Sequence, residues 1–174
     1  MPLTVQLDID AQTDAALGAL AGRLARRDRE TVRELGDVHH VSLGVYGELP
    51  LEDFIPKLAA FAQATSPIPI QLAYVGLFAG PPSVLYLGPA VTVGLLGLHQ
   101  RFHAAFADFS GRLWEHYRPG AWVPHVTLAM AEESGKLVDG INDVLRLWQP
   151  GPASLVGLRL IEFRPVRTLF YQAL

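Results

Sequence analysis

The chain has 174 residues, of which half are hydrophobic and 18% are charged, a balance typical of one globular domain and not of a disordered chain. Cysteine is absent, which excludes disulfides, thiolate metal sites and cysteine nucleophiles. The net charge is −3 and neither half carries a large basic surplus, which argues against a platform for long nucleic acid.

The beginning of the chain and its most apolar stretch both favour a cytoplasmic protein. The first ten residues show no basic stretch followed by an apolar run, so they predict no secretory signal. Residues 68–98 are the most apolar segment, but glycines and prolines interrupt them repeatedly, which is wrong for a helix that crosses a bilayer. We therefore expect no membrane partner.

The first half of the chain predicts strand, helix, strand and helix, in that order. Residues 4–9 alternate polar and apolar side chains, as a half-buried strand does. Asp10 is placed to cap a helix with leucines at positions 17, 20 and 24, which runs into the charged segment 26–30. A second strand is expected over residues 39–46, and an amphipathic helix begins near residue 51.

The second half predicts a hairpin, a helix, a strand, another helix and a closing hairpin. The predicted elements are strands over residues 68–78 and 84–87, a helix over 95–109, a strand over 122–130, a helix over 137–148 that ends before Pro150, and strands near 155–163 and 166–173. This order favours an α+β fold over a doubly wound parallel sheet. We expect one domain over residues 1–174, made of two comparable lobes with a functional site between them.

Two of these strands carry the same short motif. The first reads His40-Val41-Ser42-Leu43 and the second reads His125-Val126-Thr127-Leu128. Because side chains alternate along a strand, His40 and Ser42 share one face with positions 44 and 46, while positions 41, 43 and 45 share the other. The same alternation places His125 and Thr127 together. Each strand therefore offers an imidazole and a hydroxyl on one surface, and two such strands form a pocket.

These side chains suit the cleavage of a phosphodiester. In-line displacement at phosphorus needs a base for the incoming oxygen and an acid for the departing one, and imidazoles serve in both forms near neutral pH. Hydroxyls can donate hydrogen bonds to the non-bridging oxygens of the phosphate and stabilise the developing charge. The motifs therefore indicate catalytic roles for His40 and His125 and substrate binding by Ser42 and Thr127.

Paired His-x-Ser/Thr motifs on strands about 85 positions apart resemble those of the 2H phosphoesterase superfamily, which includes 2′-5′ RNA ligase-like proteins and cyclic phosphodiesterases. Segments 76–78, 84–87 and 161–166 are also similar to that family. The resemblance implies two pseudo-symmetric lobes of antiparallel sheet with flanking helices around a central cleft. It implies activity on 2′,3′-cyclic phosphates or 2′-5′ linkages, without metal or cofactor. Ser42 stands where Thr is commoner, which keeps the hydroxyl donor.

Other histidines invite a functional interpretation but favour a structural one. His39 is adjacent to the first motif, yet alternation turns it toward the opposite face, which favours a buried structural role. His99 and His103 are four residues apart on the third helix, a spacing found in metal sites. No third ligand is evident, so no metal is expected.

Four further side chains are candidates for substrate contact without being assigned to the site. Tyr117 and Arg118 precede the second motif and could stack a base and meet a phosphate. Arg164 and Arg167 lie near the end of the chain and are weaker candidates.

Several functions stay open at this level. The leading hypothesis is a metal-independent phosphodiesterase whose partner is a small nucleotide or a short RNA end. RNA end joining or 3′-end trimming uses the same residues, and a non-catalytic nucleotide-phosphate binding module would need the hydroxyls but not both imidazoles. A purely structural protein would leave the polar strand faces unexplained. The sequence does not decide which histidine is the base, or the oligomeric state.

Overall fold

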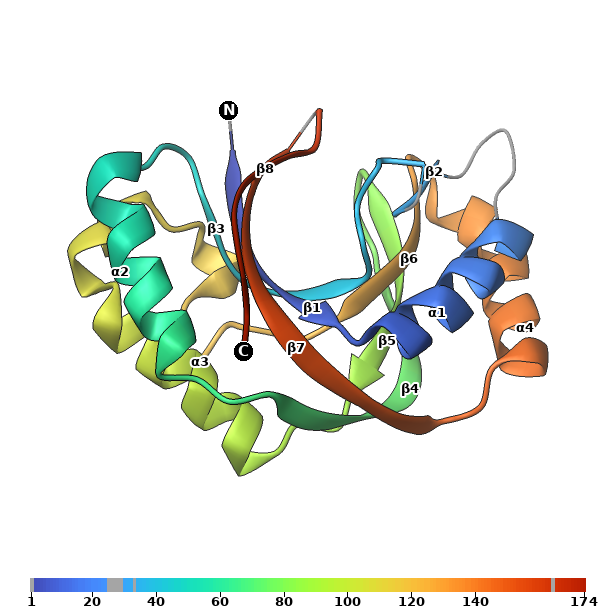
Figure 1. Ribbon diagram of the computed structural model, residues 1–174. Coiled ribbons are helices and arrows are strands. Elements are labelled where there is room, and N and C mark those ends of the chain that lie inside the picture. Colours follow the sequence, from blue (N-terminus) through green and yellow to red (C-terminus); the bar gives the residue numbers. More distant parts are fainter. Residues whose placement is uncertain (1, 25–29, 33, 164) are drawn as a thin grey trace.

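The protein is built around one curved antiparallel sheet (Figure 1). A computed structural model describes residues 2–24, 30–32, 34–163 and 165–174. The described strands run in the order β2-β6-β5-β4-β7-β1-β3. Along one edge of β7, residues 151–155 pair with β4 and residues 157–162 pair with β8. The strands are β1 Leu3–Ile9, β2 Glu30–Thr31, β3 His40–Tyr46, β4 Ile68–Phe78, β5 Ser83–Pro89, β6 Val126–Ala131, β7 Gly151–Glu162 and β8 Arg167–Ala173.

Four α-helices cover the sheet in two pairs (Figure 1). The helices are α1 Ala11–Leu24, α2 Leu51–Gln63, α3 Val93–Ala105 and α4 Val138–Leu147, with short 3-10 helices over Ala107–Arg112, Glu115–Tyr117 and Ser134–Leu137. Helix α1 packs beside α4, and α2 packs beside α3 through ring contacts such as Phe54–Phe106 and Phe61–Phe102. None of the described helices is long and apolar enough to cross a membrane.

The sheet has the internal symmetry that the sequence predicts. From the central β4–β7 pair, β5 and β6 follow on one side, and β1 and β3 follow on the other. The α+β fold with two antiparallel lobes is therefore confirmed. The lobes are not the two halves of the sequence, however, because β4 of the first half joins the β5–β6 lobe and β7 of the second half joins the β1–β3 lobe.

Most predicted elements are present, and the errors lie at their ends. The third helix ends at Ala105, so Phe109 lies in a following 3-10 turn. The second motif strand begins only at Val126, and the first closing strand begins at Gly151, ahead of its predicted start. Asp10 caps α1 as expected, because its carboxylate accepts hydrogen bonds from the backbone N–H and the hydroxyl of Thr13, both at 2.9 Å. Residues 26–29 of the charged segment lie outside the described residues.

A β-bulge follows the hydroxyl of each motif and changes which side chains face the pocket. In β3 the partners of Gln6 and Val5 are Ser42 and Gly44, so Leu43 is the extra residue. In β6 the partners of Tyr86 and Leu85 are Thr127 and Ala129, so Leu128 is the extra residue. The two bulges occupy equivalent positions, three residues after each motif histidine.

The bulges correct the strict alternation expected from the sequence. Beyond Leu43 the faces are exchanged, so Val45 lines the pocket with His40 and Ser42. Tyr46 instead turns to the helix side, where it is 1% exposed and its ring meets Phe54 edge to face at 5.5 Å. The expectation that position 46 shares the histidine face was therefore wrong.

Candidate active site

One cavity of about 220 Å³ contains all four residues of the paired motifs. Its wall is formed by residues of β1, β3, β5 and β6 and by the segments that precede the two motifs. The described lining residues are Pro2, Thr4, Val32, Leu35, Asp37, His40, Ser42, Val45, Val84, Trp114, Tyr117, His125, Thr127, Met130, Ile161 and Phe163. The structure thus brings together two imidazoles and two hydroxyls from positions 85 residues apart.

A larger open groove of about 620 Å³ lies between α1 and the start of β7. Its described lining contains no histidine, and its one acidic residue, Asp10, already accepts hydrogen bonds from Thr13 and from the backbone N–H of Ser154. The smaller cavity is therefore the candidate active site, although the groove is larger.

The two imidazoles are held by the same hydrogen bond. Nδ1 of His40 lies 2.8 Å from the carbonyl oxygen of Val38, and Nδ1 of His125 lies 2.8 Å from that of Val123. A carbonyl can only accept, so each Nδ1 carries a proton and donates it. Each ring keeps Nε2 as the nitrogen available for a proton transfer to or from a ligand.

The first hydroxyl is held by residues of the segment that precedes the second motif. Ser42 is 8% exposed, and its side chain is hydrogen-bonded with the hydroxyl of Tyr117, whose pKa is raised by burial. The carbonyl oxygen of Ser42 accepts a hydrogen bond of 2.9 Å from Nε1 of Trp122. At the bulge, the carbonyl oxygen of Leu43 lies 3.1 Å from Nε2 of His103 on α3. The motif strand is thus tied to the helices and to the loop before the second motif.

His125 lies in an aromatic environment. The rings of Phe78 and Tyr86 meet its imidazole edge to face, with centroid separations of 4.9 and 5.5 Å. Burial lowers the pKa of His125, and the nearby charge of His40 lowers it further. At neutral pH this imidazole is therefore held in its neutral form, with an unprotonated Nε2.

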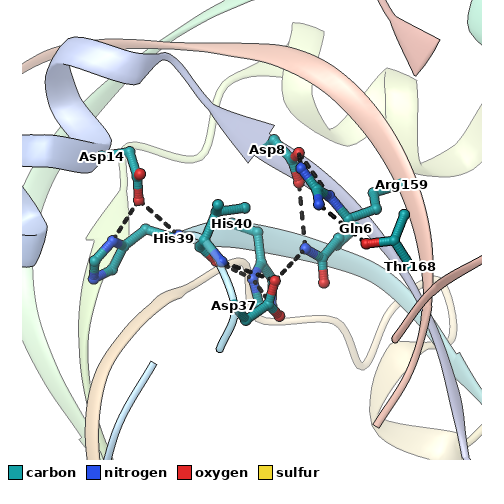
Figure 2. Close-up of polar contacts among 9 residues, drawn as sticks. Gln6, Asp8, Asp14, Asp37, His39, His40, Arg159 and Thr168 are labelled. Atoms are coloured by element: carbon teal, nitrogen blue, oxygen red, sulfur yellow. Dashed lines mark hydrogen bonds and ion pairs between the residues drawn. The ribbon is translucent and has the colours of Figure 1, made fainter. Parts of the chain in front are cut away.

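His40 lies in a polar environment (Figure 2). A carboxylate oxygen of Asp37 is 3.5 Å from Nδ1 of His40, and the other oxygen of Asp37 accepts a hydrogen bond from Nε2 of Gln6 at 3.1 Å. The same Gln6 nitrogen donates to Asp8 at 3.3 Å, and Asp8 forms a 2.6 Å ion pair with Arg159. The two motif histidines therefore have similar anchors but different surroundings.

The other histidines have structural contacts. His39 is fully buried, and its Nδ1 lies 2.7 Å from a carboxylate oxygen of Asp14 on α1. His99 stacks on Trp122 at a centroid distance of 3.9 Å, and its Nε2 is 2.9 Å from that of His103. Burial, followed by the effect of His103, lowers the pKa of His99 to about 4. Among the described residues, no group of three His, Cys, Asp or Glu side chains is arranged to hold a metal ion.

The four residues considered for substrate contact lie in different places. Tyr117 lines the cavity, whereas Arg118 pairs with Glu115 at 2.9 Å in an exposed position. Arg167 pairs with Glu162 at 2.7 Å, and Arg164 lies outside the described residues.

Sequence reasoning missed several residues that shape the cavity. They are Asp37, Val45, Met130 and Phe163, with Phe78 and Tyr86 behind His125. One signal was present, because Asp37 stands three residues before His40, within reach of its ring in a turn.

The chain is similar to known proteins in sequence and in fold. A family model described as the 2′-5′ RNA ligase superfamily matches residues 21–166. The chain is similar in structure to TT0787 of Thermus thermophilus, with a TM-score of 0.66, 22% identity, and coverage of 100% of this chain and 98% of the other. It is also similar to E. coli LigT complexed with 3′-AMP, with a TM-score of 0.65, 20% identity, and coverage of 100% and 96%.

A more distant likeness is to Kluyveromyces marxianus Usb1 with uridine monophosphate, with a TM-score of 0.52, 14% identity, and coverage of 97% and 96%. At these identities the solved structures establish a shared fold. No curated protein sequence matches the chain.

Proposed function

Because the chain belongs to the 2′-5′ RNA ligase superfamily, within the 2H phosphoesterases, we propose that it is a metal-independent phosphodiesterase acting on 2′,3′-cyclic phosphates or 2′-5′ linked nucleotides. One observation carries the proposal. Two imidazoles, each anchored through Nδ1 and each with a hydroxyl two residues later, line a single cavity. This set provides two proton-transfer groups and two donors for one phosphate.

The different surroundings of the histidines support the following division of roles in the proposed hydrolysis. Neutral His125 accepts a proton at Nε2 from the attacking water, and protonated His40 donates one from Nε2 to the departing ribose oxygen. A phosphorus–oxygen bond forms to water as the bond to the ribose oxygen breaks, and the two proton transfers balance. Ser42 and Thr127 donate hydrogen bonds to the non-bridging oxygens, whose charge develops in the transition state. After one turnover the protonation states are exchanged, and proton transfer with solvent restores them.

The cavity favours a small ligand. Its described lining contains no lysine or arginine, and its one carboxylate, that of Asp37, would repel additional phosphates. Trp114, Tyr117 and Phe163 provide aromatic surfaces that suit a nucleobase. The LigT structure with 3′-AMP and the Usb1 structure with uridine monophosphate support a ligand of nucleotide size.

The test is a substrate panel of 2′,3′-cyclic nucleotides, RNA ends with cyclic phosphates, 2′-5′ linked dinucleotides and ADP-ribose cyclic phosphate. We expect turnover that EDTA does not reduce, and at least a roughly 10²-fold loss in His40→Ala and in His125→Ala. His116→Ala is the matched control, because His116 is exposed outside the cavity. Binding without turnover would favour a binding module, and joining of RNA ends would favour the ligase direction.

A further inference from the structure

The polar network beside His40 has no counterpart beside His125, although the two sites share one backbone framework. Matching the strand registers pairs β1 with β5, β3 with β6, and β7 with β4. Position 37 then corresponds to Trp122, position 6 to Tyr86, position 8 to Gly88, and position 159 to Gly76. Each charged or amide side chain of the network is thus replaced by an aromatic ring or a glycine in the other lobe.

The network is connected without a break from the sheet to the histidine. Arg159 donates two hydrogen bonds to one oxygen of Asp8, from Nε at 2.9 Å and from a terminal nitrogen at 2.6 Å. Gln6, which is fully buried, donates from one nitrogen to Asp8 and Asp37. The oxygen of Asp37 that receives this bond also accepts the backbone N–H of Val38 at 2.8 Å. The second oxygen of Asp37 is thereby aimed at the His40 ring (Figure 2).

We propose that Asp37 is the positioning residue for His40, and that Gln6 and the Asp8–Arg159 pair hold it in place for that role. Asp37 orients the ring through Nδ1 and compensates the positive charge that His40 must carry to act as the acid. The inference rests on the proposed function, because it concerns the direction of proton transfer in that reaction.

The groups that face His40 within the described residues can be enumerated. Asp37 approaches from the preceding turn, Asp8 lies opposite on β1, and Arg159 lies beyond it on β7. His125 faces it from the position just before β6, and Tyr117 lines the same cavity. Arg159 pairs directly with Asp8 and also interacts with the charge of Asp37, and Asp37 is the carboxylate that lies against the His40 ring.

Two substitutions, one of Asp37 itself and one of a residue that holds it, test this arrangement. Asp37→Asn keeps the shape and removes the negative charge, so the alkaline limb of the kcat/KM profile should move to lower pH by about one unit. At neutral pH kcat should fall about 10-fold with KM little changed. Gln6→Met removes the hydrogen bond that holds Asp37 without changing any charge, so the alkaline limb should move in the same direction by a smaller amount. The acidic limb, set by His125, should stay in place in both variants.

Asp108→Asn is the charge-matched control, since Asp108 is exposed and pairs with Lys57 far from the cavity. A lower rate at every pH with both limbs unmoved would show that Asp37 is merely structural, and it would overturn the inference. An alkaline limb that moves to higher pH in either variant would also overturn it. If the wild-type protein turned over no substrate of the panel, the proposed function itself would fail, which is a different result. If Asp37→Asn did not fold, the direction of the Gln6→Met shift would still decide.

Discussion

Gly76 is the residue whose substitution most directly tests the aromatic surroundings of His125. A methyl group at this position would lie 2.2 Å from Cζ of Tyr86 and 2.5 Å from its hydroxyl oxygen. The Tyr86 ring has little room to withdraw, because it is 7% exposed and stacks on Phe78 at 4.4 Å. Gly76→Ala must therefore displace either the ring or strand β4.

The expected cost follows from the size of this overlap. Forcing a methyl group into a packed site typically costs about 1–3 kcal/mol of unfolding free energy. For a chain of this length, that corresponds to a fall of about 2–12 °C in Tm. Since the Tyr86 ring contacts the His125 imidazole, kcat/KM should also fall. Urea denaturation and steady-state kinetics on the best substrate measure the two effects.

The same chemical change elsewhere is the control. Gly22 lies in α1, and a methyl group there would meet no atom within 4 Å, so Gly22→Ala should stabilise the protein by about 0.4–1 kcal/mol. A double-mutant cycle with Tyr86→Ala isolates the contact, because the cost of Gly76→Ala should largely disappear once the ring is absent. An equal cost in both backgrounds would refute the reasoning.

Three further predictions concern His99 on α3, the hydroxyls of the two motifs and the size of the ligand. The pKa of His99 is lowered to about 4 from its ordinary 6.5, so the unfolded chain binds more protons there and stability falls as pH drops through that window. His99→Phe keeps a ring against Trp122 and should remove about 3 kcal/mol of the destabilisation that the wild-type protein shows at pH 4. Urea denaturation at pH 4 and at neutral pH measures this difference. Ser42→Ala and Thr127→Ala should lower kcat/KM by about 10-fold, less than the histidine variants, and the reverse ranking would favour a binding module. Affinity for cyclic-phosphate oligonucleotides should level off after about three nucleotides, with a log–log salt slope of magnitude about 2 or less, whereas a slope of about 5 or more would contradict a small ligand.

The sequence predicted that the four motif residues share one pocket, as the cavity lining shows, but it did not predict their surroundings. The motif is local, so alternation along a strand was enough to place His40 beside Ser42. The exchange of faces beyond Leu43 was not predictable, because a bulge is set by the register with β1 and leaves no mark in the β3 sequence itself. The contact between Asp37 and Gln6 was missed because the two residues are 31 positions apart and meet only when the sheet has formed.

The fold class was accessible because the order of periodic segments is itself local information. The exchange of β4 and β7 between the lobes was not, since strand periodicity indicates a buried face but not the strand that will pair with it. The early end of the third helix was missed because periodicity alone does not show where a helix stops. Phe109 continues the helical spacing, but it reaches the core from a 3-10 turn, where its ring meets Phe54 at 5.0 Å.

Each helix pair joins one helix from the first half of the sequence to one from the second half. Helix α1 buries its apolar stripe beside α4, and α2 buries its own beside α3, so each helix pair joins segments that are far apart in the sequence. A fragment ending at the turn near residue 80 would retain α1 and α2 but neither of their partners. Such a fragment should remain unfolded alone and gain structure only when the complementary fragment is added, because the missing surface is supplied in trans. The two helix pairs thus make each half of the sequence depend on the other for the surface that buries its helix.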